Sequence, residues 1–143
     1  MKFTLKKEEG LDWAVMGLEG LWWADDPSAF PEQRKDEWKW TLLIVQPDFI
    51  KAKHVRRFAA ELAEKKGSQI FKKVRLEKLR EGLCAQVMHV GPYKDAPATI
   101  GRLFEFIETQ GKSACGKHHE VWLSDPRRMA PEKLKTIMRE PVE

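Results

Sequence analysis

Apolar and polar residues in the first half of the chain predict a strand followed by a long helix. Apolar residues at alternate positions over 38–46 indicate a strand, because side chains alternate between the two faces of a strand. Over 49–66 the apolar residues recur at helical spacing and form one stripe. We expect Asp48 to cap this helix and Gly67 to end it. An earlier strand is predicted to run into 17–23, where glycines permit a bulge.

The second half of the chain predicts two strands, a helix and two further strands. The five elements are expected at 70–79, 83–90, 96–110, 119–123 and 134–139. A tight hairpin turn at 80–82 is expected to join the first two strands. This order predicts an α+β fold: a mixed, largely antiparallel sheet with two helices on one face.

Length and composition describe one globular domain over 1–143. With 143 residues, 42% of them hydrophobic and 34% charged, the chain can bury a core without a metal or a disulfide. Six tryptophans against one tyrosine are unusual. Because tryptophan joins a large apolar ring to one N–H donor, a tryptophan-rich chain often lines a ligand site, although tryptophans also fill cores.

Charge and cysteine spacing argue against several kinds of partner. The net charge is +4, but acids are interspersed among the basic residues and no nucleic-acid-binding signature occurs, which favours a solvated basic face. Cys84 and Cys115 lack the spacing of a zinc or redox pair, and the histidines add no metal pattern, so we expect no metal and no cofactor. No signal peptide or membrane-spanning run is present, so we expect a cytoplasmic protein with no membrane partner.

The first candidate for chemistry is Glu120, in the strand predicted at 119–123. Alternation places Glu120 and Trp122 on the same face, so a carboxylate lies beside an indole. Ionised, Glu120 would attract a cationic ligand; as an acid or base, it would transfer a proton. The alternative is a solvated edge-strand glutamate, or one paired with an arginine.

Further candidates come from the other aromatic segments. Glu19 and Trp22 lie in the glycine-flanked segment that can curve toward a cleft. Trp38 and Trp40 share a strand face and either line a pocket floor or fill the core. Tyr93 follows a Gly-Pro turn, which aims its ring at a cleft mouth or caps the strand end.

Several ordered motifs together resemble one known family. The segments are CAQVMHVGPY over 84–93, HEVWLSDP over 119–126, KLKT over 133–136, LEGLW over 18–22 and LIVQPD over 43–48. They resemble the GyrI-like small-molecule-binding domain family, the last two its stand-alone branch. The resemblance covers nearly the whole chain.

The resemblance implies a duplicated strand–helix–strand–strand module with a ligand cleft between the two copies. The copies would fall at 1–69 and 70–143. In the drug-responsive regulators of the family a buried acid in the cleft meets cationic aromatic drugs, and some stand-alone members hydrolyse the cyclopropane ring of DNA-alkylating antibiotics. Compared with that branch the first module is expected to be incomplete, with one cleft wall absent, shortened or supplied by a second chain.

Three functions from different classes therefore remain open. The first is binding of amphipathic aromatic or cationic small molecules, in protection against xenobiotics or antibiotics. The second is hydrolysis of strained rings, with Glu120 catalytic and with Trp22 and Tyr93 holding the substrate. The third is a protein-interaction module of the gyrase-inhibitor kind. We further expect the protein to bind a small-molecule ligand, to make no direct contact with nucleic acid, and to be a monomer or a homodimer.

Overall fold

The computed structural model describes residues 1–26, 29–30 and 34–143, which divide into two compact units. One unit combines residues 1–16 with 45–80, and the other combines residues 17–44 with 81–143. Each unit is therefore built from two separate stretches of chain. The two modules expected at 1–69 and 70–143 stay a prediction.

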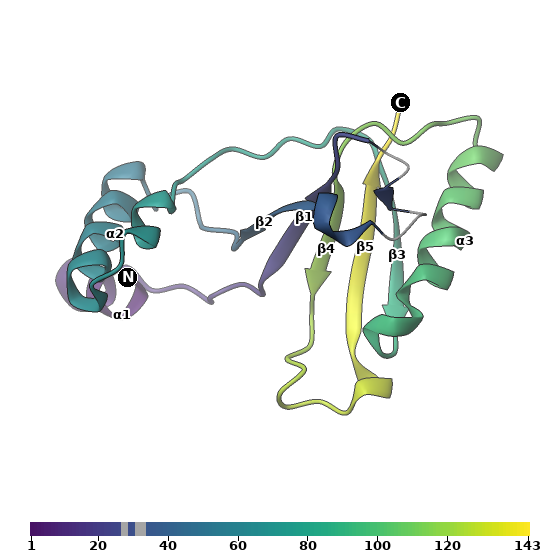
Figure 1. The fold of residues 1–143 in the computed structure, drawn as a ribbon. Coiled ribbons are helices and arrows are strands. Elements are labelled where there is room, and N and C mark those ends of the chain that lie inside the picture. Colours follow the sequence, from purple (N-terminus) through teal and green to yellow (C-terminus); the bar gives the residue numbers. More distant parts are fainter. Residues whose placement is uncertain (27–28, 31–33) are drawn as a thin grey trace. The chain divides into compact units, whose positions relative to one another are not determined.

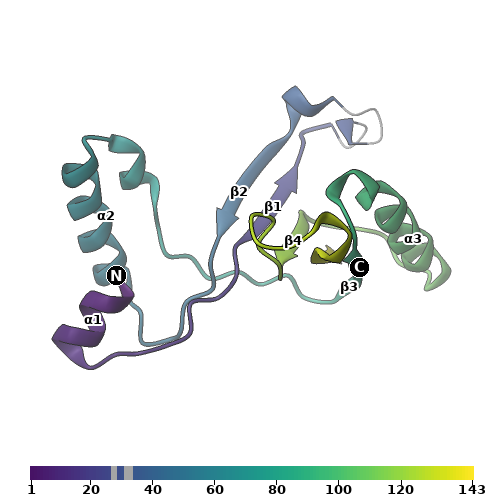
Figure 2. The same cartoon turned by 90° about the horizontal axis from the view of Figure 1, so that it is seen from below.

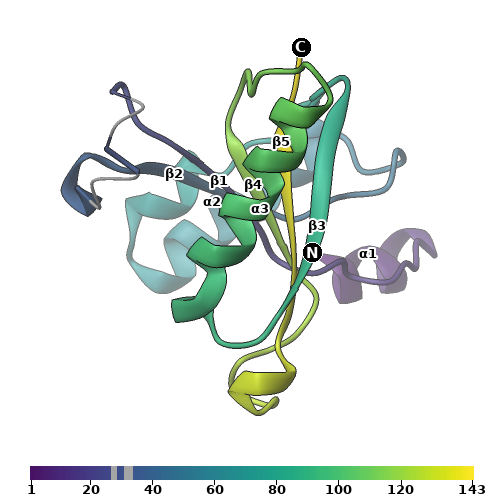
Figure 3. The same ribbon diagram turned by 90° about the vertical axis from the view of Figure 1, so that its right-hand side faces the viewer.

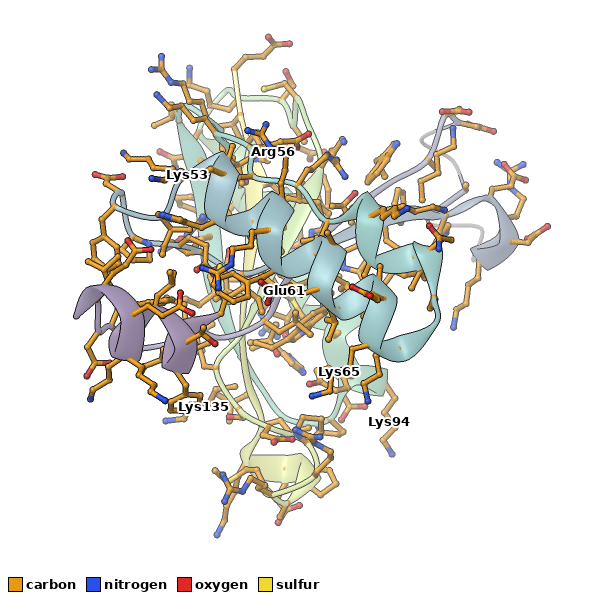
Figure 4. All side chains as sticks on the ribbon, turned by 90° about the vertical axis from the view of Figure 1, so that its left-hand side faces the viewer. Lys53, Arg56, Glu61, Lys65, Lys94 and Lys135 are labelled. Carbon is orange, nitrogen blue, oxygen red and sulfur yellow. The ribbon has the colours of Figure 1, made fainter. Side chains whose placement is uncertain are left out.

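The first unit is helical. It contains α1 (Lys2–Glu9), α2 (Ala52–Lys66) and a short 3-10 helix, η3 (Gln69–Lys73) (Figure 1). Its buried centre is formed by Leu5, Ile50 and Val55, with Leu11, Trp13 and Phe58 packed against them. The lysine, arginine and glutamate side chains of α2 remain exposed, as predicted for a solvated face; Figure 4 labels Lys53, Arg56, Glu61 and Lys65.

Helix α2 begins later than the sequence pattern predicts. Its N-cap is Lys51, whose backbone N–H donates to His54 Nδ1 at 3.1 Å, and the prediction of Asp48 as the cap is wrong. The side chain of His54 thus satisfies a backbone group that the first turn leaves open. At the other end Gly67 stops the helix as predicted, with φ 62°, a left-handed conformation that glycine adopts without steric cost.

The strand predicted at 70–79 is absent, and so is the hairpin turn at 80–82. The 3-10 helix η3 replaces the start of the predicted strand, and residues 74–83 form no regular element. Ile70 and Val74 are 62% and 54% exposed, so the alternating apolar residues have no surface to cover. Alternating apolar and polar residues form a strand only where a partner strand pairs with them and the apolar side chains pack against a core.

The second unit is a five-stranded sheet with order β2-β1-β4-β5-β3, in which every pairing is antiparallel. The strands are β1 (Glu19–Trp23), β2 (Lys39–Leu43), β3 (Cys84–Val90), β4 (His118–Trp122) and β5 (Lys135–Pro141). The predicted α+β class is confirmed, with an antiparallel sheet. Figure 2 shows the hairpin-like pair β1 and β2 running side by side.

Helix α3 (Ala96–Thr109) packs along β3 and β5 on one face of this sheet (Figure 3). Its Leu103 and Ile107 meet Met138 of β5, which is fully buried. In the register of the sheet Met138 lies opposite Glu120 of β4, so their side chains share a face. The helix therefore covers one end of the face on which Glu120 lies. That α2 joins α3 on this face stays a prediction.

Candidate functional site

Four of the predicted site residues lie on one face of the sheet, on the neighbouring strands β2, β1 and β4: Trp22, Trp40, Glu120 and Trp122. The antiparallel register places Gly20 opposite Glu120 and Trp22 opposite His118. Directly opposite residues point to the same side of a sheet, and Trp40 of β2 joins them because it is paired with Trp22. We call this surface the indole face. It comprises Gly20, Trp22, Trp40, His118, Glu120 and Trp122.

Glu120 is fixed by the indole that the sequence placed beside it. Trp122 Nε1 donates to Glu120 Oε2 at 2.9 Å, which confirms that the two side chains share a face. Strand β4 lies between β1 and β5, so Glu120 is not on an edge strand, and its side chain is 19% exposed. The structure thus contradicts the alternative of a solvated edge glutamate. It places a mostly buried carboxylate at the centre of the sheet.

Gly20 makes room for two indoles. A Cβ atom at this position would lie 2.8 Å from Trp122 Cη2 and 3.1 Å from Trp22 Nε1. Both distances are shorter than ordinary van der Waals contact, so any side chain at position 20 would displace a ring. The two indoles therefore come together over a backbone without a side chain, directly opposite Glu120.

His118 links Glu120 to a second carboxylate. His118 Nδ1 is hydrogen-bonded to Glu140 of β5, and His118 Nε2 lies 3.4 Å from Glu120 Oε1, an ion-pair contact. Burial would lower the pKa of His118, but the hydrogen bond to Glu140 and the close carboxyl group of Glu120 outweigh it and raise the pKa from 6.5 to about 9. At neutral pH an imidazolium therefore lies between two carboxyl groups.

Tyr93 lies within electrostatic reach of the same carboxylate. Its pKa is raised first by partial burial and then by the negative charges of Glu120 and Asp125. The side chain remains accessible, because Tyr93 is 42% exposed. That Tyr93 lies at the mouth of a ligand site stays a prediction.

Trp38 and Trp40 differ in their surroundings. Trp38 packs edge-on against Trp22 at a ring-centroid distance of 6.4 Å, and its Nε1 donates to the carbonyl of Ala29 at 3.1 Å. It also lies 4.9 Å from the ring of Phe30. Trp40 is 58% exposed. Trp38 therefore packs against Trp22 and holds its ring, whereas the ring of Trp40 is exposed to solvent.

Glu19 lies on the opposite face from Glu120. Strand β1 is regular, so Glu19 alternates with Gly20, and Glu19 Oε2 lies 3.0 Å from His119 Nε2. His119 Nδ1 lies 2.9 Å from Glu81 Oε1, and Arg139 Nη1 donates to Glu81 Oε2 at 3.1 Å. The structure thus groups Glu19 with a separate, buried polar cluster. It does not bring Glu19 to the other predicted site residues.

Sequence reasoning missed His118 and its partner Glu140. The spacing that paired Glu120 with Trp122 also places His118, two residues earlier, on the same face, so this signal was available. Glu140 could not be found in this way, because only the register of β4 and β5 brings it to His118. Register is set by pairing across the sheet and not by local sequence.

Other features of the described residues lie elsewhere or are absent. No group of three His, Cys, Asp or Glu side chains among them is arranged to hold a metal ion. A hollow lined by Gln86, Val87, Arg102, Leu103 and Phe106 contains none of the predicted site residues. Of the helices in the described part of the chain, none combines the length and the apolar character that crossing a bilayer requires.

Comparison with known proteins agrees with this architecture. The model of the GyrI-like small molecule binding domain matches residues 2–143. A crystal structure of an uncharacterized conserved protein from Listeria innocua is 36% identical, with a TM-score of 0.86, over 98% of this chain and 72% of that one.

Two further crystal structures are described as hydrolases, both from Listeria innocua. They are 36% and 37% identical to this chain, with TM-scores of 0.79 and 0.78. Each alignment covers 99% of this chain and 73% of the other. Among curated proteins, none matches the sequence significantly.

Proposed function

Since the chain belongs to the GyrI-like small-molecule-binding domain family, we propose that its indole face binds amphipathic or cationic aromatic small molecules. One observation carries the proposal. The Glu120 carboxylate is held by Trp122 Nε1 at 2.9 Å, between indoles and mostly out of water. Burial of a carboxylate costs free energy, and a function that uses the charge would account for its position.

The charges around Glu120 favour a positively charged ligand. His118 carries one positive charge below pH 9, while Glu120 and Glu140 are two carboxyl groups, so the array is negative overall when both are ionised. The exposed ring of Trp40 adds a π face that attracts cations. Such contacts contribute on the order of 0.5–2 kcal/mol each, so charge and ring surface together would select flat cations.

Binding of N-methylquinolinium, a flat aromatic cation, tests this proposal. Isothermal titration should show binding to the wild-type protein and a roughly tenfold weaker affinity for Glu120→Gln, equivalent to the loss of about 1.4 kcal/mol. Glu105→Gln is the matched control, because Glu105 is an exposed glutamate of α3. Equal affinities of the wild type and Glu120→Gln, or no binding at all, would refute the proposal.

A second candidate is hydrolysis of a strained ring. Two crystal structures 36% and 37% identical to this chain are described as hydrolases. In this chain Glu120 would act as acid or base, with Trp22 and Tyr93 holding the substrate. Water would add across one carbon–carbon bond of a cyclopropane, placing hydroxyl on one carbon and hydrogen on the other.

Mass spectrometry of products formed in ¹⁸O-labelled water tests the hydrolase directly. We expect one labelled oxygen in the ring-opened product of a cyclopropane-bearing DNA-alkylating compound. Glu120→Gln should lose this product while it retains binding of a neutral substrate, because the amide keeps the shape but transfers no proton. Ring opening at the same rate with the wild type, with Glu120→Gln and without protein would exclude catalysis.

A gyrase-inhibitor-like role, a cytoplasmic location and a monomeric or homodimeric state stay predictions.

A further inference from the structure

Trp22 carries a buried N–H group that has no hydrogen-bond partner among the described residues. The other indole donors near it are paired: Trp122 Nε1 with Glu120 at 2.9 Å and Trp38 Nε1 with the carbonyl of Ala29 at 3.1 Å. A buried tryptophan N–H usually finds a partner, and leaving it unpaired costs about 1–3 kcal/mol. Among the described residues, Trp22 Nε1 is the one buried indole donor without a partner, and it therefore needs an explanation.

The unpaired donor lies in the middle of the indole face. Trp22 Nε1 and the six-membered ring of Trp122 approach the same point above Gly20, at 3.1 Å and 2.8 Å from the position of a Cβ atom. Gly20 has no side chain to fill that point, and it lies directly opposite Glu120. The N–H of Trp22 is shielded from solvent where the two rings meet, so a ligand reaches this donor only when one of the rings moves aside.

A second nitrogen on this face is also incompletely bonded. His118 lies opposite Trp22 in the sheet, and its Nε2 is buried without a hydrogen bond, although Glu120 Oε1 lies 3.4 Å away as an ion-pair partner. When it is ionised, Glu120 acts only as a hydrogen-bond acceptor. The face therefore presents donors and a carboxylate within a few residues of one another.

We propose that Trp22 Nε1 selects ligands by a hydrogen-bond acceptor at the edge of an aromatic ring, a ring nitrogen or a carbonyl oxygen, while the ring lies against Trp122. This inference rests on the proposed function and narrows its ligand class. A ligand that satisfies the whole face presents an acceptor to Trp22 and a donor or positive charge to Glu120. A site with a buried donor rejects analogues without the acceptor, because the donor then stays unpaired.

Three probes with the same fused two-ring frame separate the contributions of ring stacking, of the hydrogen-bond acceptor and of the positive charge to binding. Naphthalene has neither acceptor nor charge, quinoline adds a ring nitrogen that accepts a hydrogen bond, and N-methylquinolinium has a positive charge with that nitrogen blocked. Measured at pH 8, where quinoline is neutral, quinoline should bind the wild-type protein about tenfold more tightly than naphthalene. In ¹⁵N spectra the indole N–H signal of Trp22 should shift downfield with quinoline and not with naphthalene.

Trp22→Phe removes the donor and keeps an aromatic ring, so its preference for quinoline over naphthalene should vanish. Trp23→Phe is the matched control: Trp23 is the next residue of β1, points to the opposite face and should leave the preference intact. Because the ¹⁵N measurement uses the wild-type protein, the proposal remains testable if Trp22→Phe does not fold.

Equal affinities for quinoline and naphthalene, or a preference that survives Trp22→Phe, would overturn this inference and would make the N–H a structural group buried against the Trp122 ring. If N-methylquinolinium still bound through Glu120 in that case, the proposed function would stand. If none of the three probes bound, the proposed function would fail and this inference with it.

Discussion

The position of His118 between two carboxyl groups makes the stability of the sheet depend on pH. Its pKa is raised from 6.5 to about 9 by Glu120 and Glu140. A histidine whose folded-state pKa is raised stabilises the folded form fully below its unfolded pKa. That stabilisation is lost as the pH rises through the folded pKa. The contribution should therefore be complete below pH 6.5 and gone above about 9.

The size of the effect follows from the shift. Each pKa unit corresponds to about 1.4 kcal/mol, so a shift from 6.5 to about 9 contributes on the order of 3 kcal/mol to the free energy of unfolding. The side chain of His118 is only 13% exposed, so solvent screens this contribution less than that of a surface pair. A term of this size is a large share of the total stability of a small protein.

Urea unfolding followed by tryptophan fluorescence measures this contribution. Five of the six tryptophans lie in the sheet unit, so the signal reports mainly on that unit. Between pH 6.5 and 9.5 the wild type should lose about 3 kcal/mol more than His118→Gln, because the amide cannot take up a proton. Glu105→Gln, an exposed charge change on α3, should keep the wild-type pH dependence.

Parallel curves for the wild type and His118→Gln over this pH range would refute the reasoning. They would mean that the carboxyl groups do not hold a proton on His118 in the folded state. Glu140→Gln refines the test, because it removes one of the two partners and should give an intermediate pH dependence.

Two further predictions concern the backbone of β1 and the opposite face of the sheet. Gly20→Ala should lower the free energy of unfolding by about 1–3 kcal/mol and weaken N-methylquinolinium binding, because its methyl group would lie 2.8 Å from Trp122. Unchanged melting and titration curves would contradict this prediction. His119→Leu should lower the free energy of unfolding, measured in urea, by about 3 kcal/mol or more, because Glu19 and Glu81 lose the imidazole between them. A decrease of less than about 1 kcal/mol would show that water takes the place of the imidazole.

Local pattern was sufficient to predict β4 and the geometry of its principal pair. The rule that residues two apart share a strand face placed Glu120 beside Trp122, and the 2.9 Å hydrogen bond confirms it. The same rule separates Glu19 from Trp22, which are three residues apart. We expected the glycines to permit a bulge in this segment, but β1 is a regular strand, and the absence of a side chain at Gly20 leaves space for two rings.

Features that depend on distant partners could not be predicted. The stretch 70–79 alternates like a strand yet pairs with no strand; it begins with the 3-10 helix η3, and β3 pairs with β5 alone. The contact of His118 with Glu140 joins residues 22 positions apart through the register of two strands. A single sequence contains the tendency to form strands but does not state which strands pair, so the pairing of Glu120 with Trp122 was predicted and the contacts of His118 were missed.

The two faces of β4 differ in how completely their polar groups are bonded, and this difference supports the proposed ligand site on the indole face. On the opposite face both ring nitrogens of His119 have partners, Glu19 and Glu81. On the indole face Trp22 Nε1 and His118 Nε2 have no hydrogen bond. Fully bonded buried clusters rigidify a fold, whereas incompletely bonded ones cost stability unless something completes them. Because adjacent histidines of one strand point to opposite faces, the cluster around His119 can hold β4 in place while, in the proposed function, the N–H of Trp22 on the indole face pairs with a ligand.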